Sequence, residues 1–255
     1  MSHSNFKLPK TIDEVIAELD SIVKISIDEG SRMGYFAALY KRVTLEIKTK
    51  IDEGYFDDNI RMERLDVIFA SRYLLAHHQY NTGEKCSTSW QLAFDSSKMW
   101  SPLVIQHLFV GMNAHIGLDL GIAASEVQPK NIASLHPDFI KINTVLGSLV
   151  NEVQDELASF FWPLKPIDWI LGGIDEKIAK FAMDIARDEA WKFATAYAKL
   201  SNPLERTNYI NARDIKVLNY SRKIVSPGIF INFLIRIFRG TEAGRVRYKI
   251  RRLNS

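Results

Sequence analysis

The sequence has almost no cysteine and no recognisable export signal. Among its 255 residues Cys86 is the single cysteine, so an internal disulfide is excluded. Chains without disulfides are typical of a reducing compartment. The opening stretch, MSHSNFKLPK, lacks the apolar segment of a secretory signal. We therefore expect a cytoplasmic protein.

Several well-known catalytic and nucleotide-binding patterns are also missing. The chain contains no G-x-x-x-x-G-K-[ST] phosphate loop, no G-x-G-x-x-G after a strand and no G-x-S-x-G nucleophile elbow. The Glu-x-x-His pairs of di-iron bundles do not occur either. These absences argue against P-loop, dinucleotide-binding, α/β-hydrolase and di-iron chemistry.

Strand-like alternation is almost absent, and apolar residues recur instead with the helical period. Thr11 and Glu14 form a capping box that opens the first helix. Pro137 and Pro203 each mark the start of a later helix. No Gly/Ser/Pro-rich linker divides the chain. The sequence therefore predicts an all-α fold, a single-domain multi-helix bundle over residues 1–255.

The most informative segment is 101–125, SPLVIQHLFVGMNAHIGLDLGIAAS. Ser101 and Pro102 give a start signal, and the residues that follow are apolar on nearly every side, which predicts a buried central helix. His107, His115 and Asp119 interrupt this apolar surface along one ridge. Because a buried polar group is costly unless it is partnered, the ridge should face a polar group, a metal or a ligand. We expect all three side chains to line one internal cavity.

His115 and Asp119 are spaced i, i+4, so both can reach one divalent metal ion, such as zinc, iron or manganese. A third ligand would come from another helix, and Asp138 is the first choice, with Asp184 and His77 as alternatives. The competing interpretation is a histidine–aspartate hydrogen bond that serves the fold.

Three further residues are candidates for direct roles in catalysis. His107 lies two turns before His115 and could act as an acid or base. Arg72 lies among apolar residues and needs a carboxylate or a substrate anion, and we expect it to point toward the cavity. Asn113 could orient the substrate. Alternatively, Gln106 and Asn113 bond neighbouring helices across the core.

Basic residues are concentrated at the end of the chain. The segment 216–255 has one acid, Glu242, and ten basic residues: Lys216, Arg222, Lys223, Arg236, Arg239, Arg245, Arg247, Lys249, Arg251 and Arg252. We expect a basic C-terminal extension that packs on the bundle, with a peripheral membrane contact as an open alternative. No nucleic-acid partner is expected, because no interleaved aromatic residues accompany the charges. The oligomeric state is left open.

Four segments resemble a family of unknown function: RYL (72–74), QHLFVGMNAHIGLDLGIA (106–123), HPDFIKIN (136–143) and ARDEAW (186–191). The resemblance implies a common all-α fold and supplies no reaction. In addition, H-x-x-x-D on a buried helix is similar to the helical zinc phospholipase C fold, whose tryptophan and multiple-histidine pattern is absent here.

Together these features favour an enzyme with a polar, metal-dependent or metal-free site inside a helical bundle. The apolar surroundings predict a small, largely hydrophobic substrate. The alternative is a noncatalytic helical protein that binds a lipid or another apolar small molecule, with its histidines as hydrogen-bonding core residues.

Overall fold

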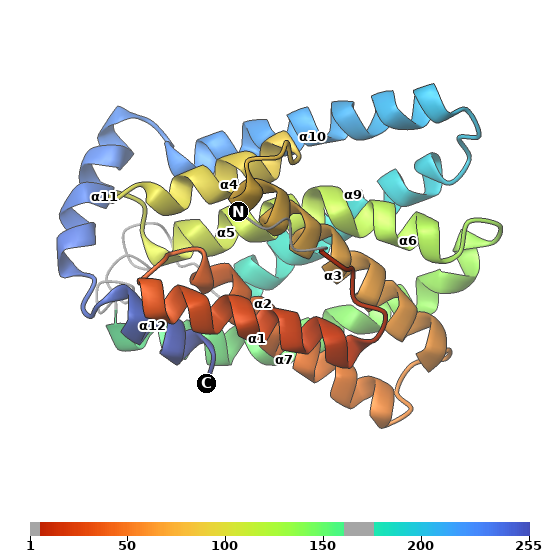
Figure 1. Cartoon of the computed structure of the whole chain (residues 1–255), viewed down its shortest axis with the longest axis horizontal. Coiled ribbons are helices and arrows are strands. Elements are labelled where there is room, and N and C mark those ends of the chain that lie inside the picture. Colours follow the sequence, from red (N-terminus) through yellow and green to blue (C-terminus); the bar gives the residue numbers. More distant parts are fainter. Residues whose placement is uncertain (1–5, 161–175) are drawn as a thin grey trace.

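The computed structural model confirms the all-α fold. It describes residues 6–160 and 176–255, and no strand occurs within these ranges. The sequence also predicts a short turn at 167–171, after Pro163 and Pro166, and this segment lies outside the described residues. Figure 1 shows a bundle in which one long helical segment runs through the middle.

Within the two described ranges the helices follow one another with short connections. The first four are α1 (Ile12–Glu29), α2 (Gly34–Asp52), α3 (Asn59–Thr82) and α4 (Thr88–Lys98). The central segment consists of α5 (Val104–Ala114), the π-helix η1 (His115–Leu120) and α6 (Gly121–Val127). After it come the 3₁₀ turn η2 (Ile132–Leu135), α7 (His136–Phe160), α9 (Glu176–Tyr197), α10 (Pro203–Val225), α11 (Ile229–Thr241) and α12 (Val246–Leu253).

Local capping explains where several helices begin and end. The Thr11 side chain accepts a hydrogen bond from the Glu14 N–H at 3.2 Å, as the capping box predicts. Glu14 accepts in return from the Lys10 N–H, one residue before the position that the capping box predicts. Gly30 ends α1 in the left-handed region, with φ of 69°, a conformation that glycine adopts without strain.

The central segment packs against α2, α3, α4, α9 and α10. Val104–Val127 is long and apolar enough to span a membrane by length and composition, but 72% of its most apolar stretch is buried inside the bundle. A core helix has the same composition. Its start was predicted at Pro102, and this is wrong by two residues. Val104 begins the helix because the side chains of Gln106 and Glu242 accept hydrogen bonds from the N–H groups of Leu103 and Val104.

Two glycines let neighbouring helices approach this segment closely. A Cβ on Gly111 would lie 2.6 Å from the ring of Phe36, on α2. A Cβ on Gly121 would lie 2.6 Å from the ring of Phe193 and 2.8 Å from the Ala190 carbonyl oxygen, on α9. Larger residues at these positions would push α2 and α9 away from the core.

The basic C-terminal segment forms α11, α12 and part of α10. α12 packs against α1, α2 and α7. Lys249 of α12 is buried and donates to the Glu242 carboxylate at 2.9 Å, which also accepts from Arg239 at 2.6 Å. Part of the basic charge is therefore paired with the protein itself.

Candidate functional site

An elongated cavity of about 190 Å³ lies between α2, α3, the α5–η1 segment and α7. Its walls are almost entirely apolar, and the lining residues are Phe36, Leu39, Tyr40, Val43, Ile47, Met62, Leu65, Asp66, Phe69, Ile105, Leu108, Phe109, Met112, His115, Ile116, Leu120, Ile142, Leu146, Leu149, Val153, Leu157 and Arg187. On α2 the lining runs from Phe36 to Ile47, which corresponds to about 17 Å of helix. The cavity therefore suits an elongated molecule.

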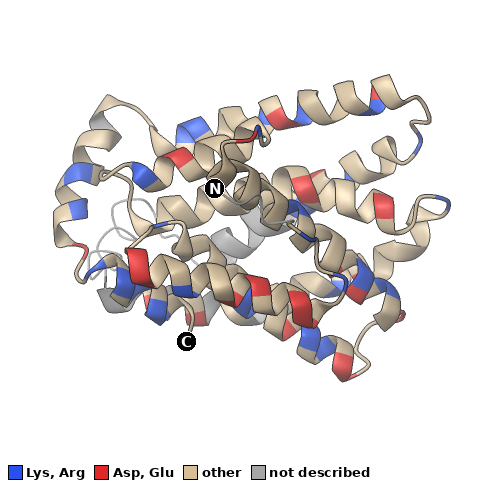
Figure 2. Ribbon diagram, in the orientation of Figure 1, with Lys and Arg blue, Asp and Glu red and all other residues tan. Residues whose placement is uncertain are grey.

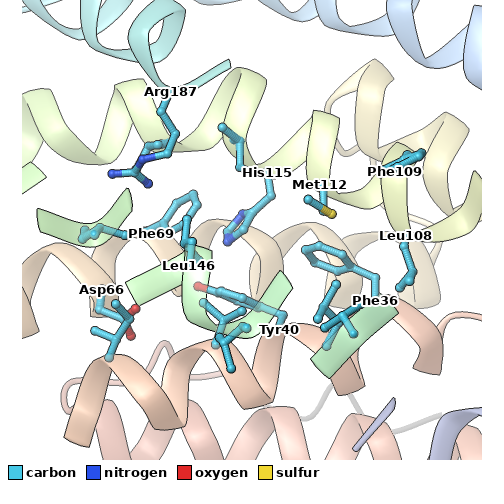
Figure 3. Close-up of a pocket in the computed structure, with 18 of the residues that line it drawn as sticks. Phe36, Tyr40, Asp66, Phe69, Leu108, Phe109, Met112, His115, Leu146 and Arg187 are labelled. Atoms are coloured by element: carbon cyan, nitrogen blue, oxygen red, sulfur yellow. The ribbon is translucent and has the colours of Figure 1, made fainter. Parts of the chain in front are cut away.

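The two ends of the cavity differ in polarity (Figure 3). Asp66, Arg187 and the hydroxyl of Tyr40 lie toward one end, and the ring of His115 lies beside them. Leu108 and Phe109 lie toward the other end, together with other apolar side chains. This arrangement matches a molecule that has a polar group at one end and an apolar tail.

His115 reaches the cavity from the centre of the molecule. Its ring stacks on Phe69 with centroids 3.5 Å apart and meets the edge of Tyr40 at 4.4 Å. Its Nδ1 lies 3.4 Å from Oδ2 of Asp119, while Nε2 is buried and makes no hydrogen bond to any described residue. Nδ1 next to a carboxylate favours the tautomer that carries its proton there, which leaves the Nε2 lone pair as an acceptor.

Asp119 is held by three nitrogen groups. Oδ1 accepts from Arg72 Nε at 2.9 Å, and Oδ2 accepts from Trp90 Nε1 at 2.7 Å in addition to facing His115. Burial opposes the charged carboxylate, but Arg72, His115 and Trp90 together lower the pKa of Asp119 below its usual value. Burial also lowers the pKa of His115, against the opposing effect of Asp119. The pair is therefore a carboxylate beside a neutral imidazole at neutral pH.

The backbone around this pair is unusual. Residues His115–Leu120 form a π-helix between two α-helices. A π-turn widens the helix by an extra residue, and such turns are frequent at functional sites. In this turn both His115 and Asp119 are buried, and Asp119 meets Arg72 from α3 and Trp90 from α4.

Two more buried polar atoms occur on the lining residues. The Tyr40 hydroxyl and Oδ2 of Asp66 have no hydrogen-bond partner within the described ranges. Burial, with a smaller contribution from Glu63, raises the pKa of Asp66 to about 7. Burial and then the charge of Asp66 raise the pKa of Tyr40 well above its usual value, so it remains a phenol. Unsatisfied buried groups are costly, and a bound polar group would satisfy them.

His107 does not share this cavity, so the prediction that His107, His115 and Asp119 line one cavity is wrong. His107 and Gly111 line a second pocket of about 20 Å³, with Tyr73 and Trp90. Phe36 fills the space beside Gly111 and lies between the two pockets, lining both. Asp119 is not among the described lining residues of either pocket.

Arg72 and Asn113 contact other parts of the fold. Arg72 has the carboxylate partner that its apolar neighbourhood predicted, but it lies behind His115 and not among the described residues of the cavity wall. Asn113 donates to the Val217 carbonyl and to the Ser221 hydroxyl, both at 2.9 Å, and so joins α5 to α10. Gln106 similarly donates to the Ile224 carbonyl. These contacts match the alternative that both amides bond neighbouring helices.

Asp138 lies elsewhere. It is fully buried and accepts hydrogen bonds from the N–H groups of Asp57 and Asp58, just before α3, and from the side chain of Arg61, in the first turn of α3. Burial would raise the pKa of Asp138, but these bonds lower it overall. The described residues contain no group of three His, Cys, Asp or Glu side chains that could hold a metal. The ligand set His115, Asp119 and Asp138 is therefore not assembled there.

The two alternative third ligands add nothing to this set. His77 bonds Asn81 within α3. The side chain of Asp184 lies outside the described residues.

Sequence reasoning missed Tyr40 and Asp66 as cavity residues. Asp66 follows Leu65 and precedes Val67 and Ile68, and an acid within such an apolar helical stretch is a usable signal. Tyr40 gave no comparable signal, because an aromatic residue on the apolar face of a helix is ordinary core. Arg187 also lines the cavity, and it donates to the Phe139 carbonyl at 2.6 Å.

A comparison with protein families finds one match. A model described as a family of unknown function, DUF5995, matches residues 12–227, so the chain belongs to this family. The match covers the cavity and ends before α11 and α12. Neither a curated protein nor a solved structure matches the chain.

Proposed function

We propose that this member of the DUF5995 family is an enzyme that binds an elongated, largely apolar small molecule in the cavity and transfers a proton at His115. One observation carries the proposal. His115 lines an apolar cavity, and its buried Nε2 has no hydrogen-bond partner in the described part of the chain, while Nδ1 faces Asp119. A histidine oriented by a carboxylate in this way can act as a general base and then as a general acid.

The groups behind His115 support this role. Trp90 and Arg72 hold Asp119, which in turn favours one tautomer and one orientation of the imidazole. The stacked ring of Phe69 restricts rotation of His115 further. Arg72 is thus a positioning residue, acting through Asp119, and not a group that touches the substrate.

The lining indicates the class of substrate. A polar group of the bound molecule would lie near Tyr40, Asp66 and His115, where a phenol donor and a carboxyl with a pKa of about 7 have no described partner. Its apolar tail would extend toward Leu108 and Phe109. A cavity of about 150 Å³ holds benzene, so one of about 190 Å³ that extends along about 17 Å of α2 has room for a slender chain, and ten-carbon compounds are the probes chosen.

Noncatalytic binding of a lipid or apolar ligand is the second candidate. The observation that favours it is the lining itself, whose described residues include no serine, threonine, cysteine or lysine. Burial also lowers the pKa of His115, which weakens the imidazole as a base.

A metal-dependent version of the enzyme stays a proposal. His115 Nε2 could ligate zinc, iron or manganese, whereas both oxygens of Asp119 already accept hydrogen bonds. Elemental analysis of protein purified without chelators separates the two versions. One equivalent of metal that is lost in His115→Gln supports the metal-dependent version, and its absence supports proton transfer by the imidazole alone.

Binding is tested first, by calorimetry with decanoic acid, 1-decanol and methyl decanoate. We expect at least one of them to bind with a stoichiometry near one, and Leu108→Trp to abolish binding by filling the apolar end. Failure of all three to bind would contradict both candidate functions.

Catalysis is tested with two probe reactions that need a base. These are hydrolysis of methyl decanoate to decanoic acid and methanol, and exchange of the α-protons of 2-decanone in D₂O. We expect His115→Gln to reduce conversion by about 10²-fold or more while binding changes by a few fold. His107→Gln, on the same helix but outside the cavity, is the matched control and should keep activity. Binding without either reaction in the unmodified protein would favour the noncatalytic alternative.

A further inference from the structure

α11 presents an apolar face to solvent. Ile229 is 93% exposed, Phe233 61% and Ile237 51%. Their spacing of four residues places them on one side of the helix. Exposed apolar side chains that gather in this way, unlike single scattered ones, mark an interaction site.

The opposite face of α11 fixes its orientation. Ile235 and Phe238 pack against the main core of the bundle. The helix cannot turn its outer face inward without removing these residues from the core. The exposed face is therefore a stable part of the surface in the described structure.

Two neighbouring residues extend the apolar surface. Trp100 is 59% exposed and Met99 46%. Arg239 of α11 donates to the Trp100 carbonyl at 2.9 Å, and its guanidinium lies 5.8 Å from the centre of the Trp100 ring. Tryptophan is enriched where proteins meet the headgroup region of a membrane.

The charges at this end are mostly basic, as Figure 2 shows along α11 and α12. The one acid of the segment, Glu242, is buried and already paired with Arg239 and Lys249. Several exposed basic residues form no ion pair with a described acid: Arg222, Lys223, Arg236, Arg245 and Arg251. The surface is thus both apolar and basic.

We propose that α11 docks the protein on the surface of an anionic lipid bilayer. The side chains of Ile229, Phe233 and Ile237 would insert among the lipid acyl chains, and the surrounding arginines and lysines would contact the anionic headgroups. A second copy of this chain would bring two basic surfaces together. A nucleic acid would leave the apolar face without a partner. An anionic lipid surface matches both properties.

The proposal does not depend on the reaction at His115. Glu242, directly after α11, contacts the first residue of α5, and Ile105 and Leu108 of α5 line the apolar part of the cavity. The docking face and that part of the cavity therefore lie at the same end of the bundle.

The test is sedimentation of the full chain with vesicles of phosphatidylcholine alone or with about one third phosphatidylserine. We expect stronger binding to the anionic vesicles. Phe233→Glu combined with Ile229→Glu should reduce that binding at least tenfold, because the two largest apolar contacts with the acyl chains are replaced by carboxylates that an anionic surface repels. Arg236→Gln should reduce it about fivefold, since one basic residue contributes about 1 kcal/mol at an anionic surface.

The matched control is Ile60→Glu, at an isoleucine on α3 that is 84% exposed, and it should leave binding unchanged. Circular dichroism and thermal unfolding establish that each variant is folded. Equal sedimentation with and without phosphatidylserine, or binding that survives the double variant, would overturn the proposal. A dimer in analytical ultracentrifugation that disappears in the double variant would also overturn it, in favour of a second copy.

Discussion

His107 and His115 lie two turns apart on the same central segment, yet their surroundings differ. Both are buried, and Nε2 of each makes no hydrogen bond within the described ranges. His115 faces Asp119 and a cavity of about 190 Å³. His107 faces a pocket of about 20 Å³, enough for about one water molecule. Its ring makes a hydrogen bond with the backbone of Pro102.

The charges around the two histidines differ as well. Burial, followed by the nearby charges of Arg32, Arg239 and Lys249, lowers the pKa of His107 to about 3. Burial also lowers the pKa of His115, but Asp119 opposes that effect. A buried histidine is therefore not by itself a functional signal. An orienting carboxylate and an accessible cavity distinguish His115 from His107.

Removing the carboxylate is the change with the largest expected effect. In Asp119→Ala, Arg72, Trp90 and His115 all lose their partner in the bundle. We expect a loss of about 3–5 kcal/mol in the free energy of unfolding, as when one partner of a buried ion pair is removed. Urea unfolding monitored by circular dichroism measures it.

His107→Leu is the control for Asp119→Ala, because it leaves no buried charge without a partner. It should destabilise the protein by much less. Equal losses of unfolding free energy in the two variants would mean that the contacts of Asp119 contribute no more to stability than those of His107.

The second prediction concerns pH. Burial raises the pKa of Asp66 to about 7 in the folded state, so the stability that this group contributes is present below pH 4 and is lost as the pH rises through 7. Asp66→Asn should therefore stabilise the protein by about 2–4 kcal/mol at pH 8, and this gain should shrink as the pH falls to 5. Urea unfolding at both pH values measures it.

His107 should behave in the opposite way. Because its folded pKa is about 3, below the unfolded value of 6.5, its stabilisation is present above pH 6.5 and is lost as the pH falls. Between pH 6.5 and 5, His107 should cost the unmodified protein about 1–2 kcal/mol in the free energy of unfolding, and His107→Leu should not show this loss.

A gain in Asp66→Asn that is independent of pH would show that Asp66 is not titrating near neutrality.

The last prediction concerns the wall between the two pockets. In Gly111→Ala the new Cβ would lie 2.6 Å from the Phe36 ring, so the ring must move. We expect a loss of about 1–3 kcal/mol, typical of overpacking, together with weaker binding of decanoic acid. Thermal unfolding and calorimetry measure these effects. Unchanged binding would indicate that Phe36 can move without altering the cavity.

Short-range patterns in the sequence predicted much of the fold. Thr11 and Gly30 mark the ends of α1 because a cap and a left-handed glycine act within one turn. Pro203 marks the first residue of α10 for a similar reason. The apolar composition of the central segment predicted its burial, and Arg72 predicted a carboxylate partner. Sequence reasoning did not identify α12, an eight-residue helix of which four residues are basic.

The amino-acid sequence by itself thus determined that the chain is helical, that one helix is central and that its polar residues need partners. Helical period and capping are set by residues one to four positions apart, and these are visible in the sequence. Which partner each polar residue meets was decided only by the tertiary structure. An ideal helix already places His107 and His115 about 80° apart, and the insertion of Phe36 beside Gly111 separates the two pockets that they line. Those contacts depend on how distant helices pack, and spacing along one helix does not contain that information.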